Sequence, residues 1–294
     1  MPDAPQFSLD ASLVRRHFAT AAAQARHSDF VAREIASRMA ERLDYIRLTP
    51  ARVLDLGCGH GADLTMLAAR YPQALRVGVD LSLPQLAAAR PPRTLLQRLA
   101  DRHGGPPLVC ADAARLPFAR ASFQLVWSNL ALNWLSDPAD AIREARRVLE
   151  VGGLLMFSTF GPDTLRELRA AWRDETGRRV HRFIDMHDLG DLLVGAGFAD
   201  PVMDMQILTL TYDDARALFA ELRATGSTNA SALRPRGLTG RARWQAMLDA
   251  LDAQRLQGRV PATLEIVFGH AWKAEPRHAE DGRPIVRFQP RSTA

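Results

Sequence analysis

The chain has 294 residues, 47% of them hydrophobic, so it can build a substantial core as one large domain with additions. Its formal net charge is +5, and all but one of the 38 basic residues are arginines, with no run of five or six, so we expect no nucleic-acid partner. The two cysteines predict neither a disulfide framework nor a metal site. The sequence shows no secretory signal and no apolar run of about 18 residues, so we expect a cytoplasmic protein with no membrane partner.

The N-terminal region predicts helix over residues 10–44. There the run VAREIASRMAERL places an apolar residue at every fourth position from Val31 to Leu43, which forms one apolar stripe. Pro50 ends this region. We expect residues 1–48 to form a helical lid over the domain that follows.

Short apolar strands then alternate with helices up to residue 160. Such alternation predicts an α/β fold, in which a parallel sheet carries helices on both faces. The expected strands are 52–56, 75–80, 108–110, 123–128 and 154–160, and the expected helices are 61–70, 84–90 and 139–149.

The pattern changes after residue 160, where the spacing predicts two helical insertions, near 161–186 and 213–258. We expect helices over 162–175 and 187–195, and strands over 201–212 and 262–272. Pro162 stands in the favoured first-turn position of its helix. The predicted fold is therefore a doubly wound, mostly parallel, seven-stranded sheet, followed by a disordered tail over 274–294.

The strongest motif is the glycine-rich turn after the first strand, RVLDLGCGHGADL. Open parallel sheets bind ligands at the carboxyl ends of their strands, where the strand order switches. Gly57-x-Gly59-x-x-Ala62 fits the dinucleotide fingerprint, with Asp80 about 20 residues on. S-Adenosylmethionine competes with a dinucleotide for this turn, because its sulfonium and ammonium groups are cationic.

Asp55 discriminates between the two ligands. A carboxylate just before the turn suits a cationic amino-acid group, whereas beside a pyrophosphate, like charges about 4 Å apart repel by ~4 kcal/mol at intermediate dielectric. The small residues Gly57 and Gly59 let backbone groups approach the methionine part. S-Adenosylmethionine is therefore the expected cofactor, bound by these three residues.

Polar residues at the next strand ends complete the expected cofactor site. Asp80 can accept hydrogen bonds from both ribose hydroxyls, since a carboxylate has two oxygens and no donor, and Leu81 follows it. Asp112 can accept from the adenine amino group, with the Ala113 amide near a ring nitrogen. Asn129 ends the fourth strand, beside the reactive end of the cofactor.

These residues resemble class I S-adenosylmethionine-dependent methyltransferases. DLGCGHG, ADAARLPFARASFQLVWSNLALNWLSDP and LEVGGLLMFSTF resemble successive motifs of that Rossmann-like family over about residues 50–160, within an expected methyltransferase domain of 49–273. SNLALNWLSDP, STFGPDTLRELRAAW and VPATLEIVFGHAWK extend a closer resemblance, to the malonyl-acyl-carrier-protein O-methyltransferases of biotin synthesis, over most of the chain. Ala25 departs from that family, which usually has a tyrosine there, and the difference bears on the substrate-covering lid.

The closer resemblance implies methyl transfer to the free carboxylate of a malonyl thioester on acyl carrier protein, or on coenzyme A. That carboxylate, with a reference pKa near ~4, is ionised at neutral pH and needs no general base, so alignment in a dry pocket can supply catalysis. A basic face would help an acidic carrier protein to dock. Arginines can pair bidentately with the carboxylate, and the candidate substrate contacts are Arg15, Arg16, Arg166 and Arg169, with Trp134 as a pocket wall.

Two other acceptors stay open at this point. A mitochondrial family of complex I assembly factors, whose members are thought to modify a protein arginine, is similar in FGPDTLRELR and PAT…AWK. A small-molecule methyltransferase with another acceptor is the second alternative. An NAD-dependent oxidoreductase is disfavoured by Asp55 and Asp112.

Overall fold

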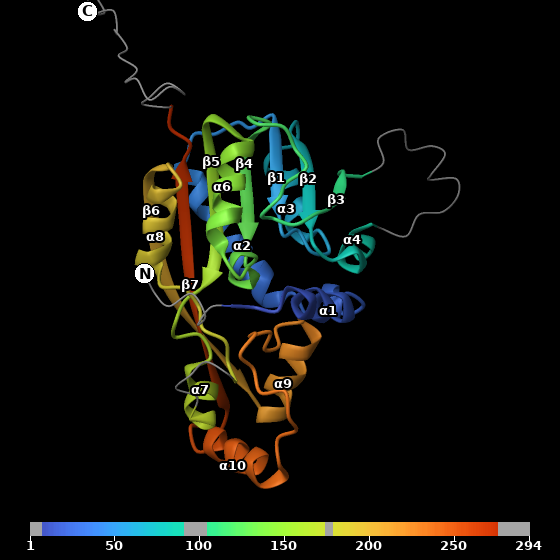
Figure 1. Cartoon of the computed structure of the whole chain (residues 1–294), viewed down its shortest axis with the longest axis vertical. Coiled ribbons are helices and arrows are strands. Elements are labelled where there is room, and N and C mark those ends of the chain that lie inside the picture. Colours follow the sequence, from blue (N-terminus) through green and yellow to red (C-terminus); the bar gives the residue numbers. More distant parts are fainter. Residues whose placement is uncertain (1–7, 91–104, 174–178, 276–294) are drawn as a thin grey trace, which may run out of the picture.

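A seven-stranded sheet of order β3-β2-β1-β4-β5-β7-β6 organises the computed structural model, which describes residues 8–90, 105–173 and 179–275 (Figure 1). The strands are β1 (Arg52–Leu56), β2 (Leu75–Asp80), β3 (Leu108–Cys110), β4 (Phe123–Asn129), β5 (Leu149–Phe160), β6 (Ala199–Tyr212) and β7 (Val260–Trp272). The strands from β3 to β5 pair in parallel, and β7 is antiparallel to both β5 and β6. The predicted doubly wound, mostly parallel sheet is confirmed.

Helices cover both faces of this sheet. The α-helices are α1 (Ala11–Ala21), α2 (Phe30–Arg42), α3 (Ala62–Arg70), α4 (Leu83–Ala89), α6 (Pro138–Val148), α7 (Arg166–Trp172), α8 (Met186–Gly195), α9 (Ala215–Ala224) and α10 (Arg241–Asp252). Successive strand residues point to opposite faces, so in β1 Val53 packs in the core under α2 and α3, while Leu54 packs in the core under α6 and α8. Burial on both faces explains why the inner strands are mostly apolar.

The ribbon of β6 and β7 is longer than the rest of the sheet. β5 ends at Phe160, opposite Ile266, whereas β7 pairs with β6 as far as Val260 and Tyr212. The projecting end of this ribbon carries α7, α9 and α10 (Figure 1). The helical insertion predicted between the last two strands is therefore present as α9 and α10.

The segment before α7 occupies the edge of β7 that β5 leaves free. The Gly161 amide donates to the Glu265 carbonyl at 2.9 Å, and the Leu165 amide donates to the Thr263 carbonyl at 2.7 Å. Glu167 is buried and accepts a hydrogen bond from the Thr263 amide at 3.0 Å. The backbone groups of a strand edge are thus paired without another strand.

Two helix predictions and one strand boundary were wrong. The helix expected over 10–44 is interrupted between α1 and α2. At this break the Asp29 carboxylate lies 2.9 Å from His60 Nε2, and this tertiary contact overrides the local helix propensity. The helix expected from Pro162 begins at Arg166, because the residues before it bond to β7. β5 begins at Leu149, five residues earlier than expected, and includes the glycine pair.

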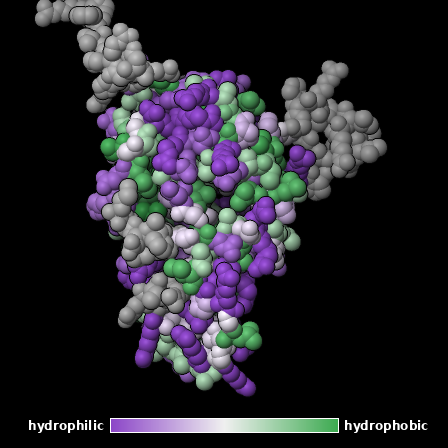
Figure 2. All heavy atoms as spheres, in the orientation of Figure 1, coloured by the Kyte–Doolittle hydropathy of each residue, from purple (hydrophilic) through white to green (hydrophobic). Residues whose placement is uncertain are grey.

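The tail expected over 274–294 lies, from residue 276 on, outside the described residues. None of the helices in the described part of the chain has the length and apolar character that a membrane crossing requires. On the face seen in Figure 2, hydrophilic residues cover much of the molecule, with hydrophobic ones scattered between them.

Candidate functional site

A cavity of about 680 Å³ lies at the carboxyl ends of β1, β2 and β4. Two parts of its wall differ in character. The turn side is formed by the glycine turn after β1, by the ends of β2 and β3, and by α1. The helical side is formed by α7, α9 and α10 and by the projecting ends of β6 and β7.

The glycine turn requires a residue without a side chain at Gly57. Gly57 has φ +82°, and a Cβ there would lie 2.3 Å from the Cβ of Ala131. The amides of Gly57 and Cys58 both donate to the Val79 carbonyl, at 2.8 and 2.9 Å. The turn is therefore held against β2, and Gly57 and Gly59 both line the cavity.

Asp80 is placed at the cavity wall by two backbone hydrogen bonds. Its Oδ2 accepts from the Gly59 amide at 2.9 Å and its Oδ1 from the Ser82 amide at 2.7 Å. Burial raises the pKa of Asp80, although these two bonds favour the ionised form. Each oxygen keeps a lone pair for a ligand hydroxyl, and Leu81 lines the cavity next to it.

Asp55 lies beneath the turn and not in the cavity wall. Its side chain is buried, with 1% of its surface exposed, and Oδ2 has no hydrogen-bond partner in the described part of the chain. Burial, followed by the nearby carboxylates Asp63 and Asp80, raises the pKa of Asp55 well above its usual range. A cation above the turn would relieve this unfavourable environment, so the residues present fit a ligand with a positively charged end.

Asp63 is a second buried carboxylate that the sequence analysis missed. It lies in the first turn of α3 and accepts a hydrogen bond from Trp127 Nε1 at 2.8 Å. Burial raises the pKa of Asp63. An acid two residues after the last glycine of the turn was the available signal.

The other predicted cofactor residues also reach the cavity. Asp112 and Ala113 line it, and the exposed Asp112 accepts through Oδ1 from the Ala114 amide at 2.9 Å. Asn129 lines it too, but its amide group is already engaged. Nδ2 donates to the Ala32 carbonyl at 2.9 Å and Oδ1 accepts from Ser158 at 2.7 Å, which ties β4 to α2 and β5.

The break between α1 and α2 supplies another part of the wall. His60 lines the cavity with Nε2 2.9 Å from Asp29, which lines it as well. Ala25, at the position where the resembling family usually has a tyrosine, lies in this part of the wall. A small residue there leaves open the space that a tyrosine ring would fill.

The four arginines predicted to contact the substrate lie outside the cavity wall that the described residues form. Arg15 and Arg16 are exposed on α1. Arg166 is exposed and lies 3.6 Å from Asp163, while Arg169 donates to two backbone carbonyls of the segment before α7. None of the four is brought to the glycine turn.

Three other arginines line the cavity: Arg179, Arg223 and Arg234. Arg179 stacks over the Trp172 ring, 4.6 Å from its centroid, and Arg234 lies 3.2 Å from Asp10. Arg223 is exposed and forms no ion pair with any described residue. These positions lie in segments that meet only in the folded chain, so local sequence patterns carried no signal for them.

Aromatic and apolar side chains dominate the helical side. The Trp244 ring packs against Trp172 and Phe219, with centroids 5.8 and 5.2 Å apart. Glu221 is a carboxyl in this wall, and burial raises its pKa. Trp134 lines the cavity, and its ring meets Phe18 of α1 edge-on, with centroids 5.1 Å apart.

No group of three or more potential metal ligands occurs among the described residues. The site combines a glycine turn and acids at successive strand ends with the apolar helical side of the cavity.

The family model of a methyltransferase domain matches residues 54–157. The malonyl-[acyl-carrier protein] O-methyltransferase of Laribacter hongkongensis is 50% identical, over 98% of this chain and 99% of that protein. The protein of the same name from Methylovorus sp. is 46% identical, over 99% of both chains. The chain belongs to the malonyl-[acyl-carrier protein] O-methyltransferase family. The predicted S-adenosylmethionine-dependent methyltransferase is thereby confirmed.

The solved structures agree with this family assignment at the level of the fold. The YcgJ protein from Bacillus subtilis superposes with a TM-score of 0.56 and 17% sequence identity, covering 81% of this chain and 98% of that one. This chain therefore carries its cavity at the carboxyl ends of the strands of a sheet that another solved protein shares.

Proposed function

We propose that this chain transfers a methyl group from S-adenosylmethionine to the free carboxylate of a malonyl thioester on acyl carrier protein, in the synthesis of biotin. The observation that carries this proposal is the end-to-end match to proteins of that name, at 50% and 46% identity. The cavity supports it, because its turn side and helical side can hold two molecules end to end. This proposed function also places the protein in the cytoplasm, where acyl carrier protein is found.

On the turn side, the residues proposed to hold S-adenosylmethionine are Asp55, Gly57, Gly59, Asp80, Leu81, Asp112, Ala113 and Asn129. Asp80 accepts from the ribose hydroxyls through the lone pairs that its two backbone bonds leave free. Asp55 acts from beneath the turn on the cationic amino-acid end. The bound cofactor supplies an activated methyl group on a sulfonium.

On the helical side, the chain supplies a dry cavity and a positive potential. Apolar walls favour the reaction, because a carboxylate and a sulfonium lose their opposite charges in the transition state. Trp134 lies in the cavity wall, where its ring contacts Phe18 of α1. Arg223, which has no acidic partner among the described residues, attracts the anionic acceptor.

Arginines outside the cavity have a different role in this proposal. Arg15 and Arg16 are exposed on α1, and Arg166 is exposed at the start of α7. These side chains would offer cations to the acidic surface of a carrier protein rather than to the reacting carboxylate.

The test is mass spectrometry of malonyl-acyl carrier protein, and of malonyl-CoA, after incubation with the protein and S-adenosylmethionine. We expect a gain of one methyl ester on the carrier-bound thioester. Gly57→Ala should abolish the gain, because its Cβ would lie 2.3 Å from Ala131. Gly152→Ala is the matched control, since Gly152 has a similar φ of +77° but open space around it.

One outcome would contradict the proposal, and another would contradict the role given to Gly57. Tight binding of S-adenosylmethionine with no methyl ester on either thioester would favour another acceptor, such as a protein arginine or a different small molecule. Equal loss of the methyl ester in both glycine variants would attribute the Gly57 effect to backbone strain in general and not to the glycine turn.

A further inference from the structure

His181 lies in the wall of the cavity. Its ring packs against Trp134, with centroids 5.2 Å apart, and against Phe183 at 4.6 Å. Only 7% of its surface is exposed. A ligand that fills the cavity beside Trp134 will therefore meet this imidazole.

One ring nitrogen of His181 has no hydrogen-bond partner among the residues that the structure describes. Nε2 is buried and forms no hydrogen bond with the described residues. Buried polar atoms in folded proteins nearly always have a partner, so an unpaired one in a cavity wall indicates a ligand. Burial, together with the nearby Arg169, lowers the pKa of His181 to about 4. At neutral pH the ring is uncharged, with one N–H donor and one acceptor nitrogen.

The position of His181 in the fold favours the methyl acceptor over the methyl donor as its ligand. The residues proposed for the adenosine part follow β2 and β3. Trp134 instead follows β4, and the Phe183 ring packs on Phe160 at the end of β5, with centroids 5.6 Å apart. Because the strand order is β3-β2-β1-β4-β5, His181 lies on the side of the cavity away from β2 and β3.

We propose that His181 binds the methyl acceptor directly and donates its ring N–H to the carboxylate oxygen that does not attack. This inference rests on the proposed function. The attacking oxygen forms a bond to the methyl carbon while the carbon–sulfur bond breaks, and the electron pair of that bond stays on sulfur. The products are a methyl ester and a neutral thioether, and no proton moves.

An uncharged hydrogen-bond donor suits this reaction because both reactants lose their charges in the transition state. A cation held against the carboxylate stabilises the ground state more than the transition state, and so raises the barrier. A neutral imidazole orients the carboxylate without that penalty. In this arrangement the cavity arginines attract the acceptor, and His181 aligns its carboxylate.

The experiment compares His181→Phe, which keeps a ring and removes its nitrogens, with His181→Gln, which keeps an uncharged donor. We expect His181→Phe to lower kcat/KM for malonyl-acyl carrier protein by about 10- to 100-fold, mostly through KM, with unchanged calorimetric affinity for S-adenosylhomocysteine. His181→Gln should restore part of the loss. The matched control is His270→Phe on β7, outside the cavity wall, with wild-type kinetics expected.

The outcomes separate this inference from the proposed function. Wild-type kinetics in His181→Phe, or a parallel loss of affinity for S-adenosylhomocysteine, would overturn the role of His181 and leave the proposed function standing. If His181→Phe does not fold, His181→Gln decides, because a folded glutamine variant that retains activity supports the inference and an inactive one overturns it. A wild-type protein that methylates no malonyl thioester overturns both.

Discussion

Among single residues, Asp55 combines a cost to the fold with a proposed role in binding. Its carboxylate is buried with one unpaired oxygen, and burial and two neighbouring acids raise its pKa. Because the pKa of Asp55 is raised in the folded state, the free energy of unfolding falls as the pH rises from the unfolded-state pKa to the folded-state pKa, and it stays lowered above that range. We expect Asp55→Asn to increase the free energy of unfolding of the cofactor-free protein at pH 7 by about 1–3 kcal/mol, measured by urea denaturation.

The same substitution should weaken the binding of S-adenosylmethionine at least about tenfold in calorimetry, because functional sites commonly trade stability for binding. Asp140→Asn is the control, since Asp140 is exposed on α6 and its loss should change the free energy of unfolding by less than about 0.5 kcal/mol. An Asp55→Asn variant that is less stable than the wild type and still binds the cofactor would show that this carboxylate is a structural partner only.

Residues at strand ends could be predicted because their signals are local. The alternation of strands and helices places the residues after β1, β2, β3 and β4 at one edge of the sheet, and seven of the eight predicted cofactor residues line the cavity there. Asp55 is the exception, one layer beneath. The cavity arginines and His181 could not be predicted in this way, since no short pattern records which distant segments will face each other.

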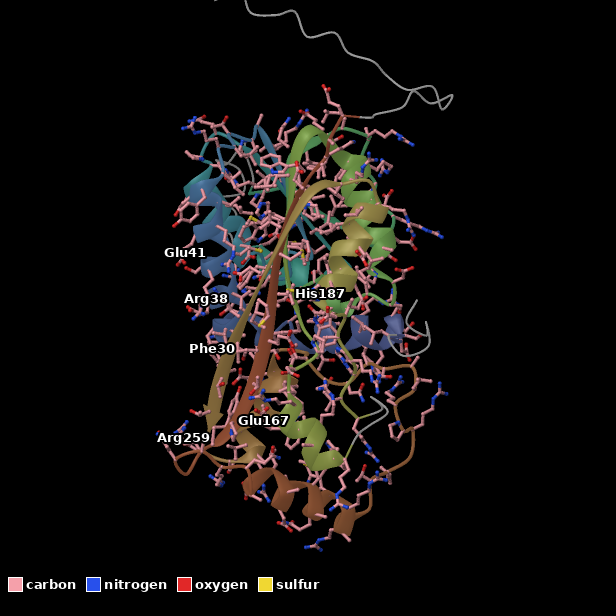
Figure 3. The ribbon with its side chains drawn as sticks, turned by 90° about the vertical axis from the view of Figure 1, so that its left-hand side faces the viewer. Phe30, Arg38, Glu41, Glu167, His187 and Arg259 are labelled. Carbon is pink, nitrogen blue, oxygen red and sulfur yellow. The ribbon has the colours of Figure 1, made fainter. Side chains whose placement is uncertain are left out.

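Among the elements, α7 depends on one buried carboxylate for its position. Glu167 accepts from the Thr263 amide at 3.0 Å and also from the Thr263 hydroxyl, and Figure 3 shows it beside the projecting part of β7. Glu167→Ala leaves that buried amide unpaired, so we expect a loss of about 2–4 kcal/mol in the free energy of unfolding. Because α7 contributes Leu168 and Trp172 to the helical side, KM for malonyl-acyl carrier protein should rise as well.

The affinity for S-adenosylhomocysteine should stay unchanged in the Glu167→Ala variant, since no residue of α7 lines the turn side. Glu41→Ala provides the control, because Glu41 lies exposed on the outer side of α2 (Figure 3). Equal losses of affinity for the cofactor and for the acceptor would mean that α7 supports the whole cavity and not its helical side alone.

The elements that sequence reasoning placed wrongly are those whose backbone bonds to distant partners. Residues 161–165 could continue a helix, but the amides of Gly161 and Leu165 are used at the edge of β7. Likewise, the alanine-rich end of α1 continues into a turn that carries Asp29 to His60. In both places a tertiary contact replaces the local preference, and in both the irregular segment contributes to the cavity wall.

In the whole molecule, α1 connects the two sides of the cavity. Gln85 of α4 donates to the Phe18 carbonyl at 2.9 Å, which ties the end of α1 to the sheet. The Asp10 amide donates to the Ala230 carbonyl at 2.9 Å, which ties its start to the insertion between β6 and β7. Residues far apart in the chain therefore enclose one volume. Sequence patterns predicted the sheet and the insertion, but not this connection between them.

This connection predicts that cofactor binding stabilises α1 together with the glycine turn, because Val14 and Phe18 line the same cavity. S-Adenosylhomocysteine at 100 times its Kd should add about 2.7 kcal/mol to the free energy of unfolding, or about 4 °C in Tm for a chain of this length. Hydrogen exchange should slow in α1 as well as after β1. Protection confined to the sheet, with α1 exchanging as fast as in the free protein, would mean that α1 does not cover the bound cofactor.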